Sequence, residues 1–106
     1  MDLGLKDKVA IVTGSSRGIG RSIALGLADE GCKLVICARG EEALQETAQD
    51  IRRKRVDVVA VAADVTKMEG AERVVTQAIE SFQGIDVLVN NVGGSLWMEI
   101  LCRKHG

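Results

Sequence analysis

The chain has 106 residues, of which 46% are hydrophobic and 27% charged, and its formal net charge is −1. This length allows one domain at most, and the composition is ordinary for a globular protein. The nearly neutral charge argues against nucleic acid or an anionic membrane surface as partners. No segment approaches the length of a membrane span, and residues 1–8 do not resemble a signal peptide. We therefore expect a cytoplasmic protein.

Cysteine usage agrees with a reducing compartment. The three cysteines, Cys32, Cys37 and Cys102, are odd in number and show no metal-binding spacing. Cys32 and Cys37 flank or lie within an apolar run, so we expect buried thiols there. We expect no metal site.

Four short apolar runs predict β-strands, at residues 9–13, 34–38, 58–62 and 87–89. Each run is continuous rather than alternating with polar residues. Continuous apolar runs are typical of strands that are covered on both faces, as in a parallel sheet.

Three helical patterns lie between these strands, at residues 18–30, 41–53 and 68–82. Apolar residues recur along each at helical spacing, and Gly31 and Gly84 are expected to end the first and the third. Strands alternating with helices predict βαβ units and a parallel sheet. The predicted fold is α/β, a three-layer Rossmann-type parallel sheet with strand order 3-2-1-4, truncated after the fourth strand.

A glycine-rich turn follows the first predicted strand and opens the first predicted helix. It reads Thr13-Gly14-Ser15-Ser16-Arg17-Gly18-Ile19-Gly20. Glycines let the backbone approach a ligand closely, and a helix N-terminus offers free N–H groups and partial positive charge to phosphate. The alternative is a plain strand-to-helix turn with incidental glycines. The context favours a turn that cradles a pyrophosphate, and the absence of Gly-Lys-Ser/Thr rules out a P-loop.

The end of the second predicted strand carries a cation where an acid is usual. An NAD-binding Rossmann unit has an acid about 20 residues beyond the turn, which binds the ribose 2′-OH. Here the sequence is Cys37-Ala38-Arg39-Gly40, without an acid. A guanidinium there can pair with a 2′-phosphate, and Arg17 is a second candidate partner. NADP(H) is therefore favoured over NAD(H), although both arginines could instead be solvent-exposed charges.

Two further polar segments follow the third and fourth predicted strands. After the third comes Asp64-Val65-Thr66, where Asp64 could bind an adenine amino group, or Asp64 or Thr66 could cap the next helix. After the fourth comes Asn90-Asn91-Val92-Gly93, a turn whose amides lie at the carboxyl edge of the sheet.

The glycine turn, the Asp64-Val65 pair and the Asn90-Asn91-Val92-Gly93 segment, in this order and spacing, resemble the short-chain dehydrogenase/reductase family over roughly residues 5–95. The resemblance is to its NADP(H)-dependent carbonyl and 3-oxoacyl reductases. It implies hydride transfer between NADP(H) and a carbonyl or alcohol. Val92 stands where the family usually has alanine.

The same resemblance implies a role for each matching residue. It places Gly14, Ser16, Arg17, Gly18, Ile19 and Gly20 along the pyrophosphate and adjacent ribose. It places Arg17 and Arg39 at the 2′-phosphate, and Asp64 and Val65 around the adenine. It places Asn90, Asn91 and Gly93 along the cofactor, with Asn90 also bracing the fourth strand.

The family's catalytic serine and Tyr-x-x-x-Lys motif have no counterpart in the sequence, which contains no tyrosine. We therefore assign no catalytic residue and expect the chain to be inactive alone. We expect a cofactor-binding half-domain at residues 1–95 and a divergent tail at residues 96–106, as in a truncated or alternatively spliced product or an altered reading frame.

Three functional hypotheses follow. The first is the NADP(H)-binding part of an oxidoreductase, whose small carbonyl or alcohol substrate binds only in a complete enzyme. The second is a non-catalytic dinucleotide-binding or regulatory module that associates with intact relatives. The third is a methyltransferase on a similar sheet, against which Arg39 argues. In each case the exposed edge of strand 87–89 is expected to favour self-association.

Overall fold

The four predicted strands assemble into one parallel sheet. A computed structural model describes residues 4–16 and 18–91. Along the chain these residues form β1 (Val9–Thr13), α1 (Gly18–Asp29), β2 (Lys33–Ala38), α2 (Glu41–Arg52), β3 (Val58–Ala62), α3 (Met68–Phe82) and β4 (Val87–Val89).

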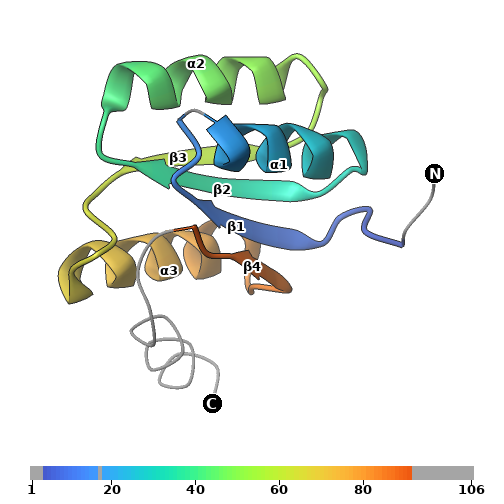
Figure 1. Cartoon of the computed structure of the whole chain (residues 1–106). Coiled ribbons are helices and arrows are strands. Elements are labelled where there is room, and N and C mark those ends of the chain that lie inside the picture. Colours follow the sequence, from blue (N-terminus) through green and yellow to red (C-terminus); the bar gives the residue numbers. More distant parts are fainter. Residues whose placement is uncertain (1–3, 17, 92–106) are drawn as a thin grey trace.

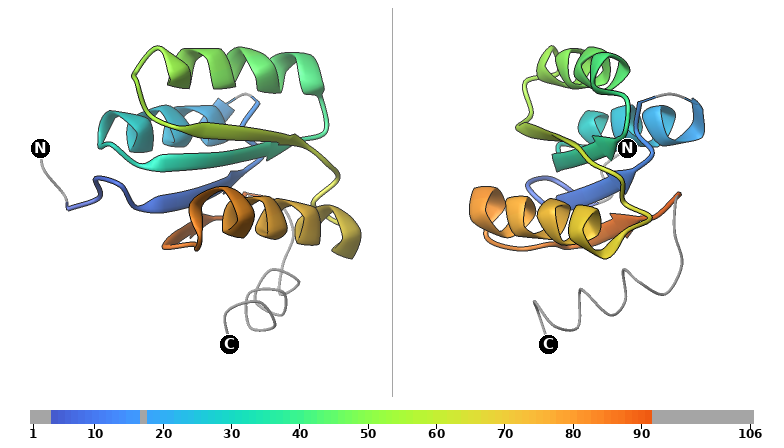
Figure 2. Two further views of the ribbon diagram at one scale, coloured as in Figure 1. Left: turned by 180° about the vertical axis from the view of Figure 1, so that it is seen from behind. Right: turned by 90° about the vertical axis from the view of Figure 1, so that its left-hand side faces the viewer.

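The strand order is β3-β2-β1-β4, and every pairing is parallel. Helices α1 and α2 cover one face of the sheet and α3 covers the other, which gives three layers (Figure 1). The views in Figure 2 show the same separation of the helices. The predicted α/β fold and its 3-2-1-4 strand order are therefore confirmed.

Side chains that alternate along the strands build two separate cores. Ile11, Val35 and Cys37 pack with α3, whereas their strand neighbours Val12 and Ile36 pack with α1 and α2. Because both faces need apolar side chains, the strands read as continuous apolar runs. Cys32 and Cys37 are both buried, as predicted.

The ends of the elements differ from the predictions at a few positions. Helix α3 ends at Phe82 and is capped by Gln83, which adopts φ +63° and donates its N–H to the Ile79 carbonyl oxygen at 2.9 Å; Gly84 does not have this role. Lys67, without a side-chain hydrogen bond, precedes the same helix. The alternative that Asp64 or Thr66 caps α3 is therefore wrong, because both residues lie one or more positions too early.

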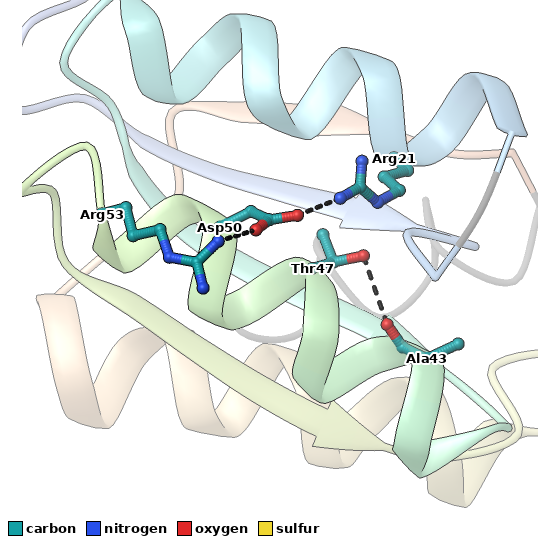
Figure 3. A network of polar contacts seen from close by, with 5 residues as sticks. All are labelled: Arg21, Ala43, Thr47, Asp50 and Arg53. Carbon is teal, nitrogen blue, oxygen red and sulfur yellow. Dashed lines mark hydrogen bonds and ion pairs between the residues drawn. The ribbon is translucent and has the colours of Figure 1, made fainter.

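An ion-pair network links the two helices on one face. Asp50 on α2 lies between Arg21 of α1 and Arg53, and its carboxylate contacts both guanidinium groups (Figure 3). The Arg53 contact is 2.9 Å long. In the same view Thr47 donates its hydroxyl to the Ala43 carbonyl oxygen one turn earlier. The network is a polar contact between α1 and α2, and α1 begins at the glycine turn.

Within residues 4–16 and 18–91, no helix combines the length and the apolar character that a membrane crossing requires.

Candidate functional site

The glycine turn lies between β1 and α1, as predicted, and two of its glycines have left-handed backbone. Gly14 has φ +67° and Gly18 has φ +63°, a region that side-chain-bearing residues rarely adopt. Between them Ser15 is buried, donates its N–H to the Cys37 carbonyl oxygen at 3.1 Å, and donates its hydroxyl to the Val12 carbonyl oxygen. The turn is therefore fixed to the backbones of β1 and β2.

Gly20 allows α1 to pack directly on the turn. A Cβ atom at this position would lie 2.1 Å from the Gly14 carbonyl oxygen and 3.0 Å from the Asn91 Nδ2 atom. Side-chain contacts as short as the first do not occur, so only glycine fits without a shift. Close helix-to-strand packing is the role of the third glycine in dinucleotide-binding turns.

The start of α1 carries the positive end of a helix dipole. This helix has 12 residues and no acidic residue in its first turn, so no carboxylate offsets the dipole there. Ile19, in this first turn, is 75% exposed and presents an apolar surface beside the glycines. Free N–H groups at such a terminus favour an anion such as phosphate.

A cavity of about 290 Å³ lies at the carboxyl ends of β1, β2 and β3. It brings together residues from three of the predicted segments. Its lining consists of Gly14, Ser16, Ala38, Arg39, Gly40, Ala63, Asp64, Val65 and Thr66. Five predicted site residues (Gly14, Ser16, Arg39, Asp64 and Val65) therefore share one cavity, although they span 52 positions of the sequence from 14 to 65 inclusive.

Arg39 and Asp64 face each other in this cavity. The Arg39 Nη2 atom lies 3.3 Å from the Asp64 Oδ2 atom, and the Arg39 side chain is 72% exposed. The other Asp64 oxygen, Oδ1, accepts hydrogen bonds from the Thr66 N–H at 3.0 Å and from its hydroxyl at 2.5 Å. The Thr66 hydrogen bonds, and to a lesser degree the Arg39 charge, hold the pKa of Asp64 below its ordinary value. The carboxylate is therefore charged at neutral pH.

Gly70, which the sequence analysis did not single out, lets α3 pack against the backbone of Asp64. It lies in the first turn of α3, where a Cβ atom would be 2.0 Å from the Asp64 carbonyl oxygen. The close approach lets α3 start directly beneath the cavity wall. A glycine in a helix was the signal available in the sequence, but only the packing shows what it meets.

Asn90 and Asn91 lie at the same end of the sheet but do not line the cavity. Thr13 donates its hydroxyl to Asn90 Oδ1 at 3.1 Å and accepts the Asn91 N–H at 2.8 Å, while Asn91 Nδ2 donates to the Thr13 carbonyl oxygen at 2.9 Å. Thr13, which the sequence analysis gave no role of its own, is the buried centre of this link. The link joins the carboxyl ends of β1 and β4.

A larger hollow of about 790 Å³ lies elsewhere, along β3 between α3 and the start of α2. Its lining includes Glu41, Glu69 and Glu72, with Arg73 as its one cationic residue. This excess of carboxylates opposes binding of phosphate, and the hollow contains no part of the glycine turn. The smaller cavity is therefore the better candidate for an anionic ligand.

Two of the predicted site residues, Arg17 and Gly93, lie outside the described residues. The same holds for Val92 and for the predicted tail at residues 96–106.

Comparison with protein families identifies one match, described as short chain dehydrogenase, over residues 8–102. A curated relative, the "CLA biosynthesis dehydrogenase/reductase" of Lactiplantibacillus plantarum, is 46% identical over 96 residues, which cover 87% of this chain and 34% of the relative. The chain thus spans about a third of the length of this relative.

Solved structures resemble the chain with a sequence identity similar to that of this relative. L-Sorbose reductase from Gluconobacter frateurii, complexed with NADPH and L-sorbose, has a TM-score of 0.84 and 47% identity, covering 89% of this chain and 36% of that one. An NAD⁺-bound xylitol dehydrogenase has a TM-score of 0.80 and 34% identity, covering 86% and 35%.

Proposed function

Because the chain belongs to the short-chain dehydrogenase family, we propose that its glycine turn and the adjoining cavity bind NADP(H) in preference to NAD(H). Residues 1–95 would form the cofactor-binding half-domain of an oxidoreductase. In the whole protein the bound cofactor would supply or accept a hydride, with a carbonyl or alcohol compound as substrate.

One observation carries this proposal: the glycine turn, the N-terminus of α1 and the Arg39 guanidinium surround the same end of the sheet, beside one cavity. Each is suited to a phosphate, the first two through backbone N–H groups and the third through its charge. A dinucleotide phosphorylated at the 2′ position carries phosphates at two separate places, which matches this arrangement.

The residues divide by the part of the cofactor that each would meet. The backbone around the turn would hold the pyrophosphate, Arg39 the 2′-phosphate, and the cavity wall the adenine. We assign to the pyrophosphate and the adjacent ribose Gly14, Ser16, Arg17, Gly18, Ile19 and Gly20. We assign to the 2′-phosphate Arg17 and Arg39, and to the adenine Asp64 and Val65. Along the rest of the cofactor would lie Asn90, Asn91 and Gly93.

The preference for NADP(H) rests on Arg39 and on the absence of an acid in the segment that follows β2. The cavity lining at this place is Ala38, Arg39 and Gly40. The relatives include both an NADPH-bound reductase and an NAD⁺-bound dehydrogenase, so membership of the family leaves the cofactor open. The choice between them depends on the side chains of this chain.

A non-catalytic role is the second candidate, and the composition favours it for the 106 residues taken alone. They contain no tyrosine, the residue that would serve as general acid and base in the family resemblance. We therefore expect this chain to bind NADPH without turning over a carbonyl substrate. A measured NADPH-dependent reduction by the purified chain would reject that expectation.

Titration of the chain with NADPH, followed by nicotinamide fluorescence, tests the proposal. We expect saturable binding that Arg39→Ala weakens by at least about tenfold for NADPH and by less than about twofold for NADH, since a charge-assisted hydrogen bond contributes about 1.5–3 kcal/mol. Arg52→Ala removes the same charge from an exposed position in the last turn of α2 and should change neither affinity. Equal affinity of the wild type and Arg39→Ala for NADPH would reject the role of Arg39.

A further inference from the structure

The ion pair between Arg39 and Asp64 places an anion beside the guanidinium proposed to bind the 2′-phosphate. The two residues follow adjacent strands, β2 and β3, which are paired in register up to Ala38 and Ala62. Both side chains line the same cavity, and their closest nitrogen and oxygen atoms are 3.3 Å apart. Any anion bound by this face of Arg39 must therefore come close to the Asp64 carboxylate.

Asp64 is the fixed member of this pair. Thr66 occupies its Oδ1 atom with two hydrogen bonds, at 3.0 Å and 2.5 Å, and this leaves Oδ2 toward Arg39. The side chain of Asp64 is 31% exposed, against 72% for Arg39. The carboxylate also keeps its charge, because the Thr66 hydrogen bonds lower its pKa.

We propose that Asp64 is a specificity-determining residue, which competes with a ribose 2′-phosphate for Arg39. This competition lowers the affinity for 2′-phosphorylated nucleotides and so reduces the preference for them over unphosphorylated ones. The inference rests on the proposed function. A 2′-phosphate takes over the guanidinium and meets the repulsion of the nearby carboxylate. An unphosphorylated ribose brings no competing charge, so the ion pair remains intact when it binds.

An orienting role, in which Asp64 helps Arg39 to bind phosphate, is the opposite possibility. Two observations oppose it. The pair has a single contact of 3.3 Å, longer than the roughly 2.7–2.9 Å that is typical of a charge-assisted hydrogen bond. The Arg39 side chain is also largely exposed, so the pair constrains its geometry weakly. Repulsion between carboxylate and phosphate needs no contact and acts over a Debye length of about 8 Å.

The variant Asp64→Asn tests the effect of the Asp64 charge separately from that of its hydrogen bonds with Thr66. Asparagine keeps an Oδ1 atom that can accept both Thr66 hydrogen bonds, while the negative charge is removed. Calorimetric titrations with adenosine 2′,5′-bisphosphate and adenosine 5′-monophosphate report on the 2′ position alone. We expect the bisphosphate to bind about 3- to 10-fold more tightly to the variant, and the monophosphate to change by less than about twofold.

Two controls identify the origin of the effect. Glu80→Gln removes one charge from an exposed position on α3, outside the cavity lining, and should leave both affinities unchanged. In the Arg39→Ala background, Asp64→Asn should have a smaller effect on the affinity for the bisphosphate, because no guanidinium remains for which carboxylate and phosphate can compete. This double-mutant cycle measures the coupling between Arg39 and Asp64. Asp64→Ser is used in the same way if the asparagine variant does not give the wild-type circular dichroism spectrum.

The outcomes are distinct. Weaker bisphosphate binding by Asp64→Asn would show an orienting role and overturn the inference. An equal change for both nucleotides would assign Asp64 to the adenine alone and would also overturn it. If the wild type binds neither nucleotide, the proposed function fails, and the inference fails with it.

Discussion

Gly20 is the residue on which the geometry of the turn depends most directly. Its missing side chain lets α1 approach the Gly14 carbonyl oxygen, and a Cβ atom there would lie 2.1 Å from that oxygen. The Gly20→Ala substitution should therefore lower the free energy of unfolding by about 1–3 kcal/mol, as expected for an overpacked site. Nucleotide binding should weaken at the same time, because the turn has to move.

Gly26 is the matched control, since it lies in the same helix and a Cβ atom added there would meet no other atom within 4 Å. The Gly26→Ala substitution should raise stability by about 0.5–1 kcal/mol through helix propensity and leave binding unchanged. Urea denaturation measures both variants. Equal effects of the two substitutions would mean that the close contact at Gly20 has no energetic importance.

Cys37 should make the protein less stable at alkaline pH. Burial raises the pKa of its thiol from an ordinary 9.0 to about 12. Between these values the folded chain keeps the proton and the unfolded chain loses it, so stability falls as pH rises. The slope contributed is about 1.4 kcal/mol per pH unit. The stability difference between the wild type and Cys37→Ala, measured by urea denaturation from about pH 8 to 11, should shrink above about pH 9; a constant difference would contradict the raised pKa.

Residue-level predictions from the sequence succeeded where a residue's position at the end of a strand determined its location in the fold. Gly14, Arg39 and Asp64 each follow a strand, so the carboxyl edge of a parallel sheet had to bring them together. The Arg39–Asp64 ion pair and the Thr13 link to Asn91 were not predicted. Both depend on side-chain directions across separate strands, which a local pattern does not contain.

At the scale of elements, the apolar patterns predicted all seven helices and strands of the described part of the chain, with ends within one residue. The errors are at the caps of α3. Gln83, in a left-handed conformation, caps the helix that Gly84 was expected to end, and Asp64 accepts hydrogen bonds from Thr66 instead of capping α3. Caps are decided by individual hydrogen bonds, whereas elements are decided by many buried side chains.

The contact between α1 and α2 includes an ionic component that can be tested separately. Asp50 contacts Arg21 and Arg53, and the Arg21 and Asp50 side chains are 34% and 30% exposed. Because partly exposed ion pairs are screened by water and salt, Asp50→Asn should cost about 1 kcal/mol or less, measured by urea denaturation. The loss should decrease further in about 0.5 M NaCl.

Glu46→Gln on α2 provides the comparison, since Glu46 forms no ion pair with any residue that the structure describes. It should leave urea stability within about 0.5 kcal/mol of the wild type. If Glu46→Gln and Asp50→Asn behave alike, the network in Figure 3 does not contribute to stability.

At the scale of the whole molecule, β4 is an edge strand that could pair with another chain. It pairs only with β1 among the described strands, and Val87, Leu88 and Val89 are all half-buried. An apolar edge strand of this kind is suited to pairing with another chain. We therefore propose that the 106-residue chain self-associates through β4, with an apparent mass in sedimentation equilibrium that rises with protein concentration.

The two edges of the sheet allow a matched comparison. Val87 on β4 and Val58 on β3 are both half-buried, and both pack against the core on the α1 and α2 side. Val87→Lys should keep the chain monomeric, whereas Val58→Lys should leave association unchanged. A monomeric wild type, or equal behaviour of the two variants, would reject an interface at β4.

Nuclear magnetic resonance of the ¹⁵N-labelled chain, titrated with NADP⁺, tests the central claim most directly, because it reports binding and its location together. We predict saturable shifts at Gly14, Ser16 and Gly18, at Arg39, and from Asp64 to Thr66. Amides of Glu69, Glu72 and Thr76, beside the larger hollow, should stay unshifted. Absence of saturable shifts, or shifts confined to that hollow, would contradict a nucleotide site at the glycine turn.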